Sequence, residues 1–84
     1  MPMSESIATE TLNGQQVGRR LRIAGFSLPP DVQQRLLEMG LTAGTECTVL
    51  RYAPLGDPME LKVRGYCLSL RLSEAAGVRV RPVC

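Results

Sequence analysis

Three cysteines are the side chains of this sequence best suited to hold a metal or attack a substrate. They stand far apart, at Cys47, Cys67 and Cys84, and the chain contains neither a C-x-x-C pair nor a histidine. The thiol and imidazole ligands of a zinc site within one chain are therefore missing. We expect Cys47 and Cys67 to be small buried apolar residues and Cys84 to be a free terminal thiol. Cys84 could capture a soft metal between two molecules, but only adventitiously.

Catalytic and cofactor chemistry finds no other support in the residue types. Without histidine there is no near-neutral general base and no imidazole to activate a cysteine. The aspartates and glutamates are scattered singly, whereas an iron site with open positions needs carboxylates clustered with histidine. The phosphate-binding pattern G-x-x-x-x-G-K-[ST] does not occur. We therefore expect no enzyme activity and no bound cofactor or metal.

The charge and length of the chain limit the classes of partner and the cellular location that we expect. Its 84 residues make one small domain. The formal net charge of +2 is too small by itself to predict binding to nucleic acid or to an anionic membrane. No apolar run is long enough to span a membrane, and the N-terminus lacks the basic-then-apolar layout of a signal peptide. We expect a cytoplasmic protein without direct membrane insertion.

The stretch from Arg35 to Thr45 predicts how a helix is aimed onto the first long strand. Gly40 is placed to end the helix in a left-handed conformation, with Leu41 folding back onto Leu36 in a Schellman motif. Gly44 suits the positive-φ position of a type II turn. The helix can begin in two ways: Asp31 with Gln34 resembles a capping box, or Pro30 is the first helical residue. Its apolar face is expected at Val32, Leu36 and Met39.

Alternating or apolar segments predict short strands separated by turn residues. Arg64-Gly65 is expected to form a tight hairpin turn, and Ser73 to cap a single helical turn. On the longest strand, Cys47, Val49 and Arg51 are expected to face one way. The polar stretch 1–16 is expected to be a flexible tail, and 17–84 to form one mainly β domain. The predicted strands are Gly18–Phe26, Thr45–Pro54, Met59–Val63, Tyr66–Leu70 and Val78–Pro82, a small five-stranded barrel with one short helix after the first strand and a helical turn before the last.

Four motifs in this order resemble the FeoA family, small cytosolic proteins of bacterial ferrous-iron transport. They are R-L-x-x-x-G-L-x-x-G-T (35–45), A-P-L-G-D-P (53–58), G-x-x-L-x-L-R (65–71) and E-A (74–75). The match runs from Leu21 to Val80. The resemblance implies an SH3-like barrel that acts with a large membrane transporter carrying a cytosolic GTP-binding domain. Related domains are appended to iron- and manganese-responsive repressors. Because the chain lacks clustered iron ligands, we do not expect it to carry ferrous iron itself.

The A-P-L-G-D-P loop is the candidate contact surface. Leu55 stands among turn formers in a connection that should run over the surface, where an apolar side chain is available to a partner. The equally weighted alternative is that Leu55 plugs one end of the barrel while Asp57 caps its own turn. The candidate partner-binding residues are Leu55, Gly56, Asp57 and Pro58, followed by Arg35 and Glu38 on the helix and Arg79 and Arg81 on the last strand.

Three functions fit these observations. The first is a non-enzymatic accessory module that docks on the cytosolic part of a ferrous-iron transporter and modulates its assembly or activity. The second is an SH3-like barrel that binds RNA through its arginines, which the low net charge and the lack of an aromatic platform disfavour. The third is a stand-alone metalloregulator-type domain that self-associates, and weak homo-oligomers are compatible with any of the three.

Overall fold

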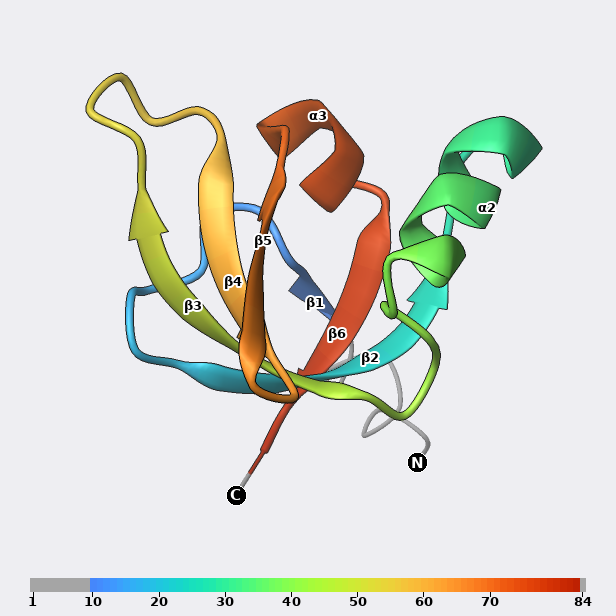
Figure 1. Ribbon diagram of the computed structural model, residues 1–84, viewed down its shortest axis with the longest axis horizontal. Helices are drawn as coiled ribbons and strands as arrows, with labels where there is room; N and C mark the ends of the chain where they lie inside the picture. Colours follow the sequence, from blue (N-terminus) through green and yellow to red (C-terminus); the bar gives the residue numbers. More distant parts are fainter. Residues whose placement is uncertain (1–9, 84) are drawn as a thin grey trace, which may run out of the picture.

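The structure is a computed structural model that describes residues 10–83. Six strands and two helices follow one another along these residues (Figure 1). They are β1 (Glu10–Thr11), β2 (Arg20–Phe26), α2 (Pro30–Glu38), β3 (Glu46–Tyr52), β4 (Met59–Val63), β5 (Tyr66–Leu70), α3 (Leu72–Ala75) and β6 (Val78–Pro82).

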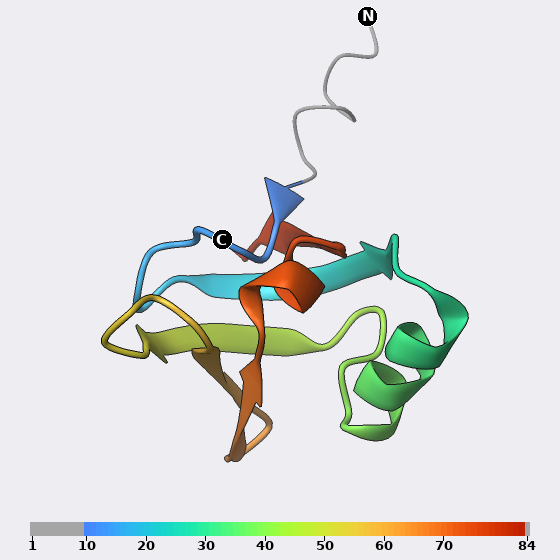
Figure 2. The same cartoon turned by 90° about the horizontal axis from the view of Figure 1, so that it is seen from above.

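The strands form one strongly curved antiparallel sheet in the order β1-β6-β2-β3-β4-β5. Chain neighbours pair directly from β2 to β5, and β6 returns to lie between β1 and β2. Helix α2 lies at one end of the sheet, and the connection between β3 and β4 projects at the other end (Figures 1 and 2). The mainly β, SH3-like fold is confirmed, with six strands instead of the five expected.

The additional strand corrects the expected boundary of the N-terminal tail. Residues 1–9 lie outside the described part of the chain, but Glu10–Thr11 pairs with β6 and the side chain of Leu12 is fully buried. The Tyr52 hydroxyl donates a hydrogen bond of 2.6 Å to the carbonyl of Gln15. The prediction of a tail through residue 16 is therefore wrong for residues 10–16. Polar composition concealed this segment because its pairing partner lies about seventy residues later in the chain.

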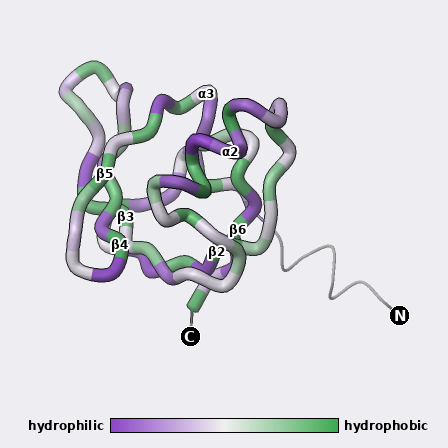
Figure 3. Tube along the Cα trace, turned by 45° about the vertical axis from the view of Figure 1, so that its right-hand side comes forward, coloured by the Kyte–Doolittle hydropathy of each residue, from purple (hydrophilic) through white to green (hydrophobic). Residues whose placement is uncertain are grey.

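Aliphatic side chains fill the space enclosed by the sheet. Hydrophobic and hydrophilic residues alternate along the strands (Figure 3), so each strand turns one row of side chains inward. Helix α2 contributes Leu36, and Leu41, three residues after the end of the helix, is also buried in the core. The other buried apolar residues are Leu12, Leu21, Ile23, Cys47, Val49, Met59, Leu61, Val63, Leu70, Ala75, Val78 and Val80.

A bulge in β3 changes which of its residues face the core. The register against β4 shifts between Val49 and Arg51. Cys47 and Val49 are buried as expected, but Arg51 is exposed and Tyr52 packs against the core instead. The expectation that Arg51 shares their face is wrong, because one additional residue in a strand reverses the alternation beyond it.

The end of α2 has the predicted Schellman geometry. Gly40, with a φ of 100°, donates its N–H to the Leu37 carbonyl at 3.0 Å, and the Leu41 N–H reaches the Leu36 carbonyl at 3.0 Å. The helix begins at Pro30, after Pro29, and no side chain caps it. The alternative with Pro30 as the first helical residue is thus the correct one, and the Asp31 capping box does not form.

Two of the predicted turns are also present. Gly44 has a φ of 91°, and the Thr45 N–H binds the Thr42 carbonyl at 3.0 Å, as a type II turn requires. Arg64 and Gly65 both have positive φ and join Val63 to Tyr66, its partner across the β4–β5 pair. This is the pattern of a two-residue type I′ hairpin.

The two cysteines in the described part of the chain differ in environment. Cys47 is buried, and burial raises the pKa of its thiol to about 11. Cys67 is exposed on β5, so the expectation that it is buried is wrong. The position lies on an edge strand, where one face of the sheet has no covering layer. Cys84, the expected terminal thiol, lies outside the described residues.

This difference predicts the labelling of thiols by Ellman's reagent in a Cys84→Ser variant. The thiolate is the reactive form, so exposed Cys67 should react quickly and Cys47 only after unfolding by denaturant. Stopped-flow absorbance should resolve one fast thiol per native chain, and a Cys67→Ser, Cys84→Ser double variant should have none. Rapid labelling of that double variant would show that Cys47 is accessible.

Candidate functional site

The connection between β3 and β4 forms a tight, hydrogen-bonded loop with an apolar tip. The Ala53 N–H binds the Pro58 carbonyl at 2.9 Å, and the Gly56 N–H binds the Ala53 carbonyl at 2.7 Å. The peptide bond between Asp57 and Pro58 is cis. The side chain of Leu55 is 97% exposed. Leu55 therefore does not plug the barrel, and it extends from a backbone that is held in one shape by its own hydrogen bonds.

Asp57 ties this loop to helix α3. Its Oδ1 accepts a hydrogen bond of 3.0 Å from the backbone N–H of Leu72, the first residue of α3. The alternative in which Leu55 plugs the barrel and Asp57 caps its own turn is therefore wrong. The expected cap at Ser73 is also wrong: α3 begins at Leu72 with Arg71 as its N-cap, and the Asp57 carboxylate from another loop accepts the N–H of Leu72.

The base of the loop continues into a shallow hollow toward α2. Pro58 and Arg71 line this hollow together with Arg35 of α2 and Met39, the residue that follows the helix. The hollow has a volume of about 300 Å³. An ion pair between Arg35 and Glu74 joins α2 to α3 across it. Among the candidate residues outside the loop, Arg35 thus lies in the neighbourhood of Asp57 and Pro58.

The remaining candidates lie elsewhere. Glu38 accepts a hydrogen bond from Gln34 within α2. Arg79 donates to the Phe26 carbonyl at 3.0 Å and to the Ser27 hydroxyl, so its guanidinium holds the connection between β2 and α2. Arg81 borders a different hollow, beside Gly44. These three residues do not share a surface with the Leu55 loop.

Sequence reasoning missed one exposed apolar side chain. Val17, in the connection between β1 and β2, is 61% exposed. This connection and the Leu55 loop project at the same end of the sheet in two perpendicular views (Figures 1 and 2). The available sequence signal was a single β-branched residue between a glutamine and a glycine. It was overlooked because Val17 directly follows the stretch that was expected to be a flexible tail. Val17 and Leu55 together give this end of the molecule an apolar character.

Most arginines are already engaged within the chain. Glu46 receives hydrogen bonds from both Arg20 and Arg22, and the bond from Arg20 is the main reason that the pKa of Glu46 lies below its usual value. Glu10 pairs with Arg19, and Glu60 pairs with Arg51. Such pairing reduces the number of cations available to phosphates. Within residues 10–83 no cluster of three or more potential ligands for a metal is found, and none of the helices described could cross a membrane.

A family model described as the FeoA domain matches residues 10–82. The chain belongs to the FeoA family. The match begins at Glu10, the first residue of β1.

Two solved structures of FeoA proteins are similar to this chain over most of its length. The solution structure of a FeoA protein from Chlorobium tepidum has a TM-score of 0.84 and 36% identity, over 89% of this chain and 71% of that chain. A FeoA-like protein from Clostridium acetobutylicum has a TM-score of 0.83 and 34% identity, over 92% and 90% of the two chains.

A curated relative joins this domain to a transporter. The chain is 42% identical over 48 residues to a Fe(2+) transport protein A/Fe(2+) transporter FeoB fusion protein of Porphyromonas gingivalis. The match covers 57% of this chain but spans only 6% of the length of that relative. In that protein, by its name, a FeoA part and a FeoB transporter occupy one polypeptide.

Proposed function

We propose that this FeoA-family chain is a non-enzymatic accessory module of ferrous-iron uptake that docks on the cytosolic part of a membrane transporter of the FeoB kind. The fusion relative supports this pairing. Two functions joined in one polypeptide are held at a high effective concentration. Where they are encoded separately, association has to come from complementary surfaces. The proposed site of action is the cytoplasm.

The single observation that supports this docking surface is the solvent exposure of the Leu55 side chain. A leucine that is 97% exposed gains stability only when a partner covers it, because removing apolar area from water is favourable. Its loop is already ordered by the Ala53–Pro58 hydrogen bonds and by the contact from Asp57 to α3. A preordered loop loses little conformational entropy on binding, which is the property expected of an anchor residue.

Regulation would follow from differential binding. A module without catalytic groups can alter a transporter only by binding one of its conformations more tightly than another. If nucleotide-bound and nucleotide-free states of the transporter present different surfaces to the Leu55 loop, the module shifts the balance between them. Co-purification with the transporter from detergent-solubilised membranes, with and without guanine nucleotide, tests this directly. Equal or absent recovery of the module under both conditions would contradict a role in nucleotide-coupled gating.

A Leu55→Ser variant tests the docking surface. Binding to the transporter should weaken by about 1–3 kcal/mol, the usual range for an anchor side chain. The melting midpoint should hardly change, because the side chain is solvent-exposed and contributes little to the core. Titration of the purified module against the detergent-solubilised transporter measures the first quantity, and circular dichroism melts measure the second.

An Arg81→Gln variant is the control for that experiment. Arg81 is exposed and borders the hollow beside Gly44, which no residue of the Leu55 loop lines, and its replacement should leave transporter binding unchanged if the Leu55 end makes the contact. Loss of affinity in Arg81→Gln together with normal affinity in Leu55→Ser would move the docking surface to the last strand.

A further inference from the structure

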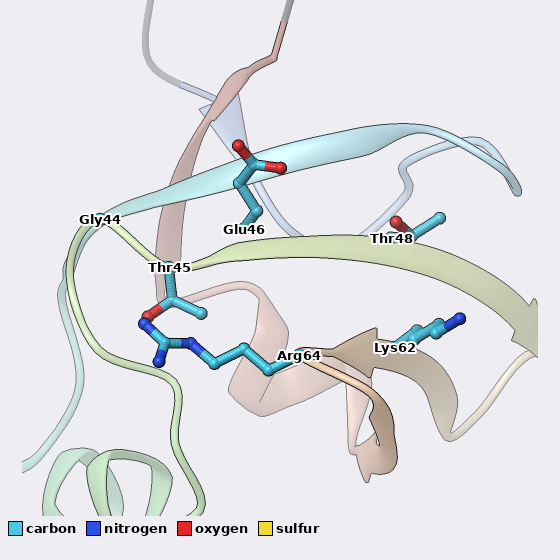
Figure 4. Close-up of a pocket in the computed structure, with 6 residues that line it drawn as sticks. All are labelled: Gly44, Thr45, Glu46, Thr48, Lys62 and Arg64. Atoms are coloured by element: carbon cyan, nitrogen blue, oxygen red, sulfur yellow. The ribbon is translucent and has the colours of Figure 1, made fainter.

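The outer face of the sheet carries an open hollow that the proposed docking surface does not use. It lies between the turn at Gly44 and strand β4 (Figure 4) and has a volume of about 470 Å³. Lys62 and Arg64 line it from β4 and from the turn that follows, and Figure 4 shows the guanidinium of Arg64 lying toward Thr45. The complete lining consists of Gly44, Thr45, Glu46, Thr48, Lys62 and Arg64.

The two cations of this hollow differ from most other basic residues of the chain. Lys62 and Arg64 are exposed, and no ion pair or side-chain hydrogen bond joins either of them to another residue in the described part of the chain. Two uncompensated positive charges in one concave surface repel each other and attract an anionic ligand. The pair is therefore available for a partner.

Neighbouring strands extend the positive charge beyond the hollow. Lys62 lies opposite Thr48, which in turn lies opposite Arg20, so these side chains share the outer face of the sheet. In the adjacent row, Arg22 lies opposite both Arg81 and Glu46. With Arg64, these two rows hold five cations and one carboxylate, and the neighbouring pair of Arg51 and Glu60 adds no net charge. This excess of four positive charges is larger than the net charge of +2 of the whole chain.

The position of Glu46 discriminates between possible anions. Its bonds to Arg20 and Arg22 hold its pKa below the usual value, so it stays negatively charged at neutral pH in the middle of the positive surface. A nucleic acid carries a charge on every nucleotide and would have to place phosphates beside this carboxylate. A peptide can place an uncharged residue there and its acidic residues on either side.

Other features of the surface also favour a peptide. The residues that line the hollow include no aromatic side chain on which a base could stack and no large apolar side chain that could enter a lipid layer. They do include the hydroxyl of Thr48, together with a guanidinium and an ammonium, which are groups that bind carboxylates.

We infer that the hollow between Gly44 and Arg64 is a binding site for an acidic, aspartate- or glutamate-rich segment of a partner protein. The contact lies on the outer face of the sheet, whereas the Leu55 loop projects from one end of it. The inference does not depend on which protein the Leu55 loop binds.

Fluorescence anisotropy of a fluorescein-labelled oligoglutamate peptide, mixed with the full chain, tests the site. The peptide should bind, and the affinity should fall as salt is added. A Lys62→Gln, Arg64→Asn double variant should bind about tenfold more weakly, because each exposed charge contact is worth up to about fivefold. Asparagine is chosen at position 64 because it tolerates the positive φ of this turn. Unchanged affinity in the double variant would overturn the inference.

An Arg71→Gln variant is the matched control, since Arg71 is an exposed arginine outside the hollow. It should lose less than about twofold in affinity, as expected for a distant, screened charge. If the double variant unfolds, amide chemical shifts of the native chain during peptide titration still locate the site, and shifts confined to residues outside 44–48 and 62–64 would overturn it. Tighter binding of a thymidine oligonucleotide, or of vesicles of phosphatidylcholine and phosphatidylglycerol, than of the peptide would also overturn it.

Discussion

Replacement of Gly40 by valine is expected to lower the free energy of unfolding by about 2–4 kcal/mol. Gly40 has a φ of 100°, a conformation that costs an L-residue about 1–2 kcal/mol and a β-branched one more. A Cβ at this position would also collide with the hydroxyl of Tyr66. That hydroxyl donates a hydrogen bond to the Met39 carbonyl at the end of α2, and loss of the bond adds about 0.5–1.5 kcal/mol. Urea unfolding followed by circular dichroism measures the change.

Two comparisons separate the causes of this loss. Gly44 has a φ of 91°, but a Cβ there would meet no atom within 4 Å. Gly44→Ala should therefore show only the backbone cost, and Gly40→Ala should lose more. Gly40→Asn should be milder than Gly40→Val because asparagine tolerates positive φ, and adding Tyr66→Phe should recover part of what remains. Equal effects of Gly40→Ala and Gly44→Ala would mean that Tyr66 makes no difference.

Replacement of Leu36 by serine should be still more damaging, by about 3–5 kcal/mol. Leu36 is fully buried on the core face of α2. Truncation of a buried leucine leaves a cavity, which costs about 2–5 kcal/mol, and the hydroxyl would add a polar group to an apolar site. Domains of this kind are stable by only about 5–15 kcal/mol in total. Thermal and urea melts should show a population that is partly unfolded at physiological temperature.

The adjacent leucine is the control for this substitution. Leu37 is only half-buried, so Leu37→Ser should cost clearly less than Leu36→Ser. Transporter binding should fail in Leu36→Ser in proportion to the unfolded fraction, and it should be restored at lower temperature where the fold recovers. Leu55→Ser should show the opposite combination, with weak binding and a normal melt. A Leu36→Ser variant that melts normally would show that α2 is not anchored through this side chain.

The features that the sequence determined alone are those whose signals lie within a few consecutive residues. Gly40 and Leu41 specify the end of α2 because glycine reaches a positive φ at no steric cost. The Arg64-Gly65 turn specifies the β4–β5 hairpin in the same way. The turn-forming residues around Leu55 predicted a surface loop, although the sequence left two positions open for the leucine itself. The four motifs also sufficed to recognise the family.

Tertiary structure decided the features that depend on partners far away in the chain. Strand β1 forms because it pairs with β6. The composition of the segment carries no sign of this distant partner, and by itself it predicted a tail. The bulge that turns Arg51 outward arises between two paired strands, and the first N–H of α3 is capped by Asp57 from another loop. Likewise, Lys62 and Arg20 share one face only through the registers of β2, β3 and β4. Backbone preferences act over one turn, whereas strand register and caps from distant loops are set by packing of the whole sheet.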